Sequence, residues 1–155
     1  MTTRTPPNGR ASSDAPVDAP VGLPLPAPVR ALLDDANHAV LSTLQPDGSP
    51  QTSVVWVGRD GDDVLVSSQD GRRKVKNVRA DARVSLLLLD RRDPERYTEI
   101  RGTATVAEDV DRALAVALAE KYEGEGAGRE YLELPPEQVR VTIRITPARL
   151  TGPVR

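Results

Sequence analysis

The stretch that decides the fold is HAVLSTLQPDGSPQTSVVWV, residues 38–57. Two runs rich in β-branched and apolar residues, 38–44 and 51–57, flank the turn QPDGSP. The Asp47-Gly48 pair inside that turn is a strong hairpin signal between such runs. The stretch therefore predicts two antiparallel strands that pair through a tight turn.

Four further strands are predicted along the chain. After a second turn, GRDGDD, comes VLVSS at 64–68, which completes an antiparallel meander with the first two strands. The apolar run RVSLLLLD at 83–90 is typical of a strand buried on both faces. Residues 97–108 and 139–150 alternate apolar and polar side chains, as half-buried strands do. Six strands without βαβ alternation predict a mainly β fold, a closed or half-closed antiparallel barrel with short helices.

Three segments have helical spacing. VRALLDDA, 29–36, follows a proline and forms a short amphipathic pattern. RRKVKNVRA, 72–80, places two valines on one face, and DVDRALAVALAEKYEG, 109–124, ends at a glycine that favours a helix stop. We expect the first helix to enter the domain and two or three helices to be inserted between the strands.

Composition limits the domain organisation and the compartment. Half of the 14 prolines fall before residue 29, so residues 1–28 are predicted to form a flexible tail and residues 29–155 a single domain. The first twenty residues lack the apolar core of a signal peptide, and no later stretch reaches the roughly 20 apolar residues of a membrane span. These features predict a soluble, cytoplasmic protein without a membrane partner.

The composition also excludes several chemistries. Without cysteine there are no disulfides, thiolate nucleophiles or cysteine-bound metals, so redox chemistry requires a bound cofactor. His38 is the single histidine and the chain has no cysteine, which argues against a catalytic zinc and a serine triad. A structural or surface role for His38 is favoured. GEGAGRE, 124–130, superficially resembles a Gly-rich nucleotide-binding loop. It follows a helix, whereas a dinucleotide-binding loop follows a strand, which argues against phosphate binding there. A pI near 5.5 argues against a nucleic-acid partner.

The basic segment GRRKVKNVR, 71–79, has five basic side chains in nine positions and no acid. In a helix, Arg72 and Lys74 lie in the first turn, where the macrodipole disfavours cations by about 0.3 to 1 kcal/mol. An anion bound by free amides, the dipole and these two cations would reverse that cost, with Ser67 and Ser68 supplying hydroxyls. A solvated basic face capped by Asp70 is the alternative, and the spacing leaves both interpretations open.

Three blocks of this sequence together resemble a known superfamily. The pattern LSTL-x-PDG-x-P-Q, followed by GRRK-x-x-N and D-x-R-V-S-L, resembles the pyridoxamine 5′-phosphate oxidase-like split β-barrel proteins, and more narrowly their branch that uses the deazaflavin coenzyme F420. The resemblance runs from about residue 29 to residue 150. It implies a six-stranded split barrel and a homodimer with two cofactor sites at the subunit interface.

The resemblance also implies which residues bind the cofactor, F420 or alternatively FMN. Residues of the basic segment and the preceding strand would hold the phosphate and ribityl chain, and residues of the first hairpin would line the ring. Trp56 has a second interpretation as a core or interface aromatic, and Tyr97 is expected to approach from the partner subunit. The implied cofactor-binding set is Gln51, Ser53, Val54, Val55, Trp56, Ser67, Ser68, Arg72, Lys74, Lys76 and Asn77.

The implied activity is transfer of a hydride between the deazaflavin and a small conjugated acceptor. The cofactor carries this chemistry, so no catalytic side chain and no metal are expected. An FMN-dependent oxidase or reductase of the same fold is the nearest alternative, and a non-enzymatic flavin-binding or haem-binding barrel, with His38 as axial ligand, is another. The chain lacks the longer C-terminal segment of true pyridoxamine phosphate oxidases, which argues against that activity.

Overall fold

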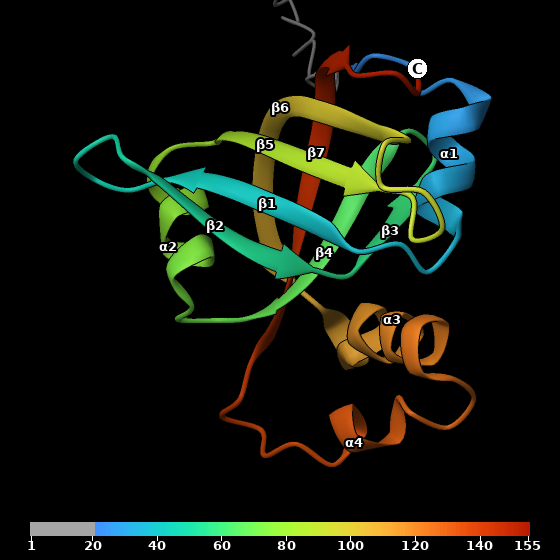
Figure 1. Ribbon diagram of the computed structural model, residues 1–155. Helices are drawn as coiled ribbons and strands as arrows, with labels where there is room; N and C mark the ends of the chain where they lie inside the picture. The colour runs from blue at the N-terminus through green and yellow to red at the C-terminus, as the bar shows by residue number, and fades with distance from the viewer. Residues whose placement is uncertain (1–20) are drawn as a thin grey trace, which may run out of the picture.

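The computed structural model describes residues 21–155, and it consists of one curled sheet with helices at its margins (Figure 1). The prediction for residues 1–20 of the tail lies outside the described residues. Leu25 is buried, and its backbone amide donates to Asp62 at 3.1 Å. The chain therefore packs against the sheet from a few residues before the predicted domain start at 29.

Seven antiparallel strands form the sheet in the order β2-β1-β5-β6-β7-β4-β3. All of their pairings in the described residues are antiparallel. The strands are β1 (Ala39–Leu44), β2 (Pro50–Val55), β3 (Val57–Asp60), β4 (Asp63–Gln69), β5 (Arg83–Leu89), β6 (Tyr97–Glu108) and β7 (Arg140–Thr151).

The prediction of six strands is wrong because the predicted strand 51–57 is broken at Trp56. β2 ends at Val55 and β3 begins at Val57, and the predicted turn 58–63 supplies most of β3. β2 and β3 are the two edges of the sheet, yet they are consecutive in the chain. The sheet therefore curls until its edges meet at Trp56, but no pairing in the described part of the chain closes it. This matches the half-closed form of the predicted barrel.

Within residues 21–155, five short helical segments accompany the sheet. The predicted helices at 29–36 and 72–80 are confirmed within two residues, and the predicted helix 109–124 is split by a backbone kink into a 3-10 turn and an α-helix. In Figure 1, α1 covers one end of the sheet, α2 lies at the other, and α3 and α4 lie together beside the open edge. The helices are α1 (Ala27–Asp34), α2 (Arg73–Ala80), η1 (Val110–Arg112), α3 (Ala113–Glu123) and α4 (Arg129–Leu132).

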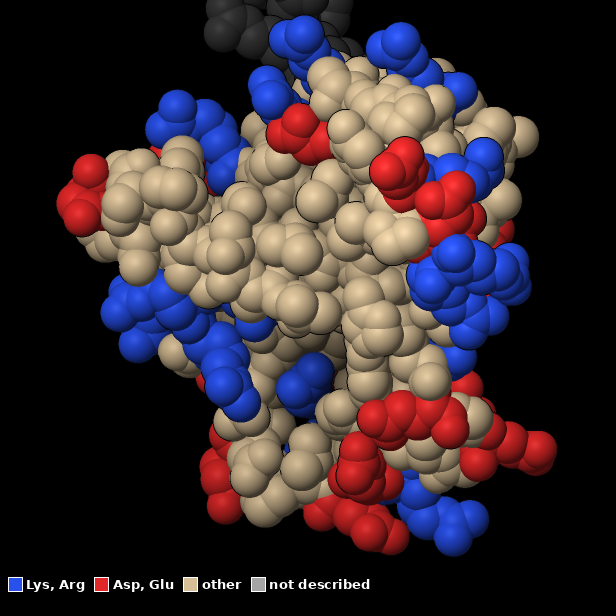
Figure 2. All heavy atoms as spheres, viewed as in Figure 1, with Lys and Arg blue, Asp and Glu red and all other residues tan. Residues whose placement is uncertain are grey.

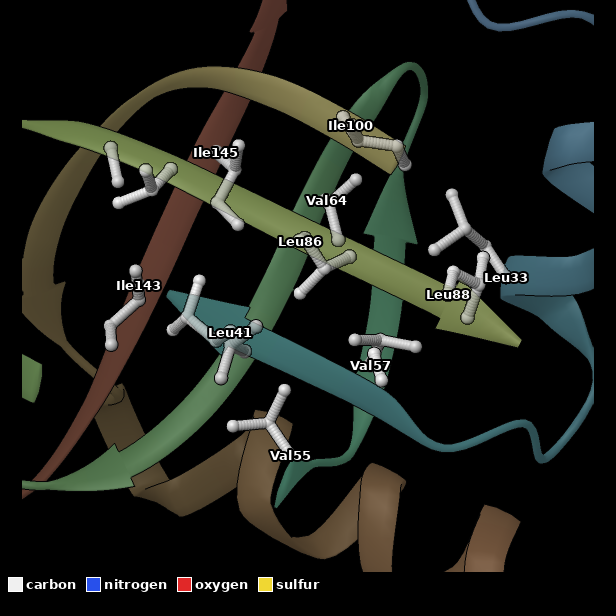
Figure 3. Packing of buried hydrophobic residues seen from close by; sticks show 14 of the residues in the cluster. Leu33, Leu41, Val55, Val57, Val64, Leu86, Leu88, Ile100, Ile143 and Ile145 are labelled. Carbon is white, nitrogen blue, oxygen red and sulfur yellow. The ribbon is translucent and has the colours of Figure 1, made fainter. Parts of the chain in front are cut away.

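The core lies between the two halves of the curled sheet. Figure 3 shows Leu41 and Leu86 from β1 and β5 facing Val64 and Ile143 from β4 and β7. All four side chains are fully buried. Burying a side chain of this size stabilises the fold by about 1.5 to 3 kcal/mol relative to leaving it in water. The core is therefore formed by side chains that the predicted strands contribute from the inner face of the sheet.

β5 differs from its prediction as a strand buried on both faces. Val84, Leu86 and Leu88 are buried on the core side, whereas Ser85, Leu87 and Leu89 are half-exposed on the outer side. A continuous apolar run cannot distinguish a strand sandwiched within one chain from one with a half-covered outer face. The outer face of β5 is therefore only partly covered by this chain.

Candidate cofactor-binding site

A cavity of about 210 Å³ lies where β2 gives way to β3, beside the start of α2. Its lining includes five residues of the predicted cofactor-binding set, Val54, Val55, Trp56, Ser67 and Lys74. Ala115, Leu118, Tyr131 and Arg140 complete the lining. Figure 2 shows a hollow between the sheet and the α3–α4 region with a Lys or Arg side chain inside it, and further basic side chains over α2. Strands and helices far apart in the sequence thus meet at a cationic cavity.

The positive charges at this cavity repel one another. Lys74 is half-buried, and burial, followed by the charges of Arg72 and Arg140, lowers the pKa of its ammonium group. Burial is also the largest cause that lowers the pKa of Arg140. None of the described carboxylates forms an ion pair with any of the three. A bound anion would offset both burial and mutual repulsion.

The start of α2 adds backbone donors to the same place. The helix begins at Arg73, with Arg72 at the N-cap and no side chain capping it. Among the described residues, no hydrogen bond uses the backbone amides of Arg73 and Lys74. Asp70 does not cap the helix as the alternative interpretation required; it pairs with Arg79 at 2.5 Å and accepts from the amide of Gly71. Free first-turn amides beside cations are suited to phosphate.

Sequence reasoning missed Arg140. It begins β7, one of several arginines in an alternating strand, and nothing local distinguishes it from the others. In the fold its Nη2 donates to Ser67 Oγ at 2.7 Å, and its guanidinium lies 5.2 Å from the centre of the Tyr131 ring. Its Nε is buried with no hydrogen-bond partner in the described chain. A buried guanidinium with an unused donor is well suited to an anion.

Trp56 is held by α3. Its ring stacks on Tyr122 with centroids 5.1 Å apart and planes 7° apart. The Tyr122 hydroxyl accepts from the amide of Val57 at 3.0 Å and donates to the carbonyl of Asn37 at 2.5 Å. Lys121 donates to the carbonyls of Leu33 and Val57. These contacts fix the break between β2 and β3, and with it the aromatic wall of the cavity.

Other sequence-named residues do not line the cavity. Ser68 and Asn77 are 5% and 2% exposed and point into the interior, where Asn77 donates to Thr43 at 3.0 Å. Gln51 bonds to Thr43 and the Thr52 carbonyl, and the buried Ser53 hydroxyl has no partner among the described residues. Arg72 and Lys76 are exposed, Arg72 near enough to Lys74 to lower its pKa. Contact of these residues with a cofactor stays a prediction.

The remaining sequence candidates show no second site. His38 contacts Tyr122 with ring centroids 5.6 Å apart, as a packed aromatic would. No group of three or more metal-ligating side chains gathers anywhere in residues 21–155. No helix in that range combines the length and apolar character needed to cross a membrane.

A family model described as pyridoxamine 5′-phosphate oxidase matches residues 25–152. The chain belongs to this family. The match covers the whole sheet and every residue that lines the cavity. The predicted family resemblance is therefore confirmed, and the mainly β fold observed here agrees with it. A search of curated protein sequences finds no match.

Solved structures extend this family assignment. An F420 reductase is 28% identical with a TM-score of 0.69, and the alignment covers 82% of this chain and 98% of that protein. A conserved hypothetical protein from Mycobacterium tuberculosis is 24% identical with a TM-score of 0.67, with 84% of each chain covered. A pyridoxamine 5′-phosphate oxidase-related, FMN-binding protein from Nostoc punctiforme is 13% identical with a TM-score of 0.53, covering 73% of this chain and 71% of that one. The last two show the fold alone.

Proposed function

We propose that this family member is an oxidoreductase that binds coenzyme F420 at the cavity between β2, α2 and β7. The observation that carries the proposal is the gathering of Arg72, Lys74 and Arg140 without a carboxylate partner in the described chain. The 28% identical F420 reductase supports F420 over FMN. When bound, the deazaflavin would supply hydride transfer to or from the substrate.

The residues present fit a phosphate-bearing cofactor. Lys74 and Arg140 offer charged donors, the unused Nε of Arg140 needs an acceptor, and the free amides at the start of α2 point to the same region. Charge-assisted hydrogen bonds of this kind are roughly twice as strong as neutral ones. We assign these groups to the phosphate.

Trp56, Val54 and Val55 form the apolar wall of the cavity. They would hold the ring system and exclude water from it, while Tyr122 fixes the orientation of Trp56. The substrate we expect is a small, electron-poor conjugated molecule, because a hydride acceptor needs a polarised double bond. No side chain of this chain is assigned a chemical step.

A second copy of the chain would complete the site. The cavity of about 210 Å³ is smaller than typical ligand pockets of about 300 to 1,000 Å³. Val54 is 66% exposed at the cavity rim, and the outer face of β5 is half-covered. We therefore propose that the protein is a homodimer in which a partner contributes to each cavity, with Tyr97, 38% exposed, as one candidate contributor.

The test is a titration of the purified protein with F420 and, separately, FMN. Trp56 is the single tryptophan of the chain and lies in the cavity wall, so its fluorescence reports ligand binding directly. The proposal expects saturable quenching by F420 and weaker binding of FMN. Tighter binding of FMN would transfer the protein to the flavin-dependent alternative, and binding of neither would refute the cofactor assignment.

A further inference from the structure

Arg112 organises the segment that follows α3. Its side chain reaches across to residues 131–138 and donates to backbone carbonyls there. Two bonds are short, 2.7 Å to Leu134 and 2.7 Å to Pro135, and one to Tyr131 is 3.0 Å. Longer contacts, 3.4 and 3.5 Å, reach the carbonyls of Leu132 and Gln138. One guanidinium therefore satisfies carbonyls along a loop that has only the short α4 as regular structure.

The backbone at Arg112 is strained to make this possible. Asp111 and Arg112 both have positive φ, 57° and 56°, and they are the only described non-glycine residues that do. L-residues adopt this conformation at a conformational cost, and it persists where surrounding contacts enforce it. Asp109, which precedes the kink, accepts from the amides of Leu114 and Ala115, each at 2.9 Å. The kink thus begins α3 and also directs the Arg112 side chain toward the loop.

The loop that Arg112 holds carries one wall of the candidate site. Tyr131 lines the cavity, and its ring packs against the Arg140 guanidinium at 5.2 Å. Arg140 in turn donates to Ser67 at 2.7 Å. A second cavity, of about 340 Å³, is lined by residues of the same loop together with Arg112 and Arg140. Arg140 therefore borders both cavities, and the contacts of the loop decide how it is directed between them.

We infer that Arg112 is a positioning residue for the anion-binding part of the site. By bonding to the 131–138 carbonyls, it keeps Tyr131 over Arg140, and Arg140 stays directed toward Ser67 and the first cavity. Arg112 itself does not line that cavity. Loss of Arg112 releases the loop, and Arg140 is then no longer held toward Ser67 and the first cavity. The inference deepens the proposed function and rests on it for the identity of the ligand.

The first test needs no ligand. Amide hydrogen exchange of residues 131–138 is measured in the wild type, Arg112→Ala, Arg112→Lys and Arg129→Ala. Arg129 is an exposed arginine that makes no side-chain hydrogen bond in the described chain, so it is the matched control. We expect exchange in this segment to rise by about tenfold or more in Arg112→Ala, less in Arg112→Lys, and not at all in Arg129→Ala. Equal protection in all four proteins would overturn the inference.

A double-mutant cycle then tests whether Arg112 acts through Arg140. F420 and FMN are titrated into Arg112→Ala, Arg140→Ala and the double variant, each with its unfolding midpoint measured. Positioning predicts that Arg112→Ala weakens binding of the preferred cofactor by about tenfold and that the double variant is no weaker than Arg140→Ala. Fully additive losses would overturn the inference.

The two hypotheses fail differently. If the wild type binds neither cofactor, the proposed function fails, while the exchange experiment and a titration with inorganic pyrophosphate still decide the role of Arg112. Weaker pyrophosphate binding by Arg112→Ala than by Arg129→Ala supports the inference, and equal binding overturns it. Arg112→Lys guards against misfolding, because it keeps the charge and part of the donor set.

Discussion

Two groups of cations in this protein have opposite surroundings. On the outer surface, arginines form ion pairs with carboxylates. At the cavity, Arg72, Lys74 and Arg140 lie near one another and form no ion pair with a described carboxylate. The paired group comprises Arg59 with Asp34, Arg79 with Asp70, Arg83 with Asp81, Arg91 and Arg92 with Asp35, Arg96 with Asp90, Arg101 with Glu99, and Arg144 with Asp60 and Asp63.

The difference separates structural charges from charges available to a ligand. The paired arginines already have their acceptors, and exposed pairs of this kind add little to stability. Lys74 and Arg140 reduce stability in the free protein because both are partly buried and because they and Arg72 carry like charges. Functional sites commonly carry such a cost.

The largest effect is expected at Arg140. Arg140→Ala removes the guanidinium that bonds to Ser67 and leaves the proposed phosphate without its planar donor. We expect cofactor affinity to fall by about 1.5 to 3 kcal/mol, as for loss of a hydrogen bond to a charged group. Arg140→Lys should recover part of this loss, because it keeps the charge but not the fork geometry. Calorimetric titration measures both, and an unchanged affinity in Arg140→Ala would remove Arg140 from the site.

A smaller effect, on stability, is expected at Glu99, the carboxylate partner of Arg101. Its carboxylate accepts from Arg101, Ser85 and Thr151, which lowers its pKa from 4.5 to about 2. Because the folded pKa is depressed, this stabilisation is complete above pH 4.5 and is lost as the pH falls toward 2. Glu99→Gln should reduce stability at pH 7 by about 1 kcal/mol, after solvent screening, and remove this part of the acid dependence. Denaturant unfolding between pH 2 and 7 checks it.

Lys74→Met should give an effect of the opposite sign and smaller size. The folded pKa of Lys74 is lowered by burial and by Arg72 and Arg140, so its charged form destabilises the fold below that pKa. The destabilisation disappears as the pH rises through the lowered pKa toward the usual 10.5. The variant should therefore be more stable than the wild type at pH 7, by less than about 1 kcal/mol because the side chain is half-exposed. Thermal unfolding at pH 7 and pH 10 should show this gain shrinking with pH, together with weaker cofactor binding at pH 7.

The smallest effect is expected at Arg79, the paired cation of the same helix. Arg79→Ala breaks the exposed pair with Asp70 and touches no residue of the cavity. We expect no resolvable change in the unfolding midpoint and none in cofactor affinity. A clear loss of affinity in this variant would mean that total basic charge, and not the unpaired group, governs binding.

The sequence predicted the fold where local chemistry determines it. The Asp47-Gly48 turn pairs β1 with β2 through six residues each, so the first hairpin was readable from 38–57 alone. The break at Trp56 was not readable, because Lys121 and Tyr122 impose it from the distant helix α3. A single-sequence pattern carries no signal for such a contact, so two strands were interpreted as one.

The same distinction applies to the site. Lys74, Trp56 and Ser67, which the sequence and the resemblance placed near one another, line one cavity, and their contact with a cofactor stays a prediction. Arg140 was missed because its role depends on the pairing of β4 with β7, which brings Gln69 opposite Arg140 and places Ser67 within its reach. Asn77 was named for the phosphate, but the fold turns its side chain to Thr43 in the interior. Residues whose role arises from long-range pairing need the structure to reveal them.

The most direct measurement compares F420 binding by the wild type and Lys74→Ala, followed through the fluorescence of the single tryptophan, Trp56. The account predicts saturable binding by the wild type and an affinity about tenfold or more lower in the variant, with the fold intact. Equal affinities for both proteins, or no saturable binding of either F420 or FMN by the wild type, would contradict it.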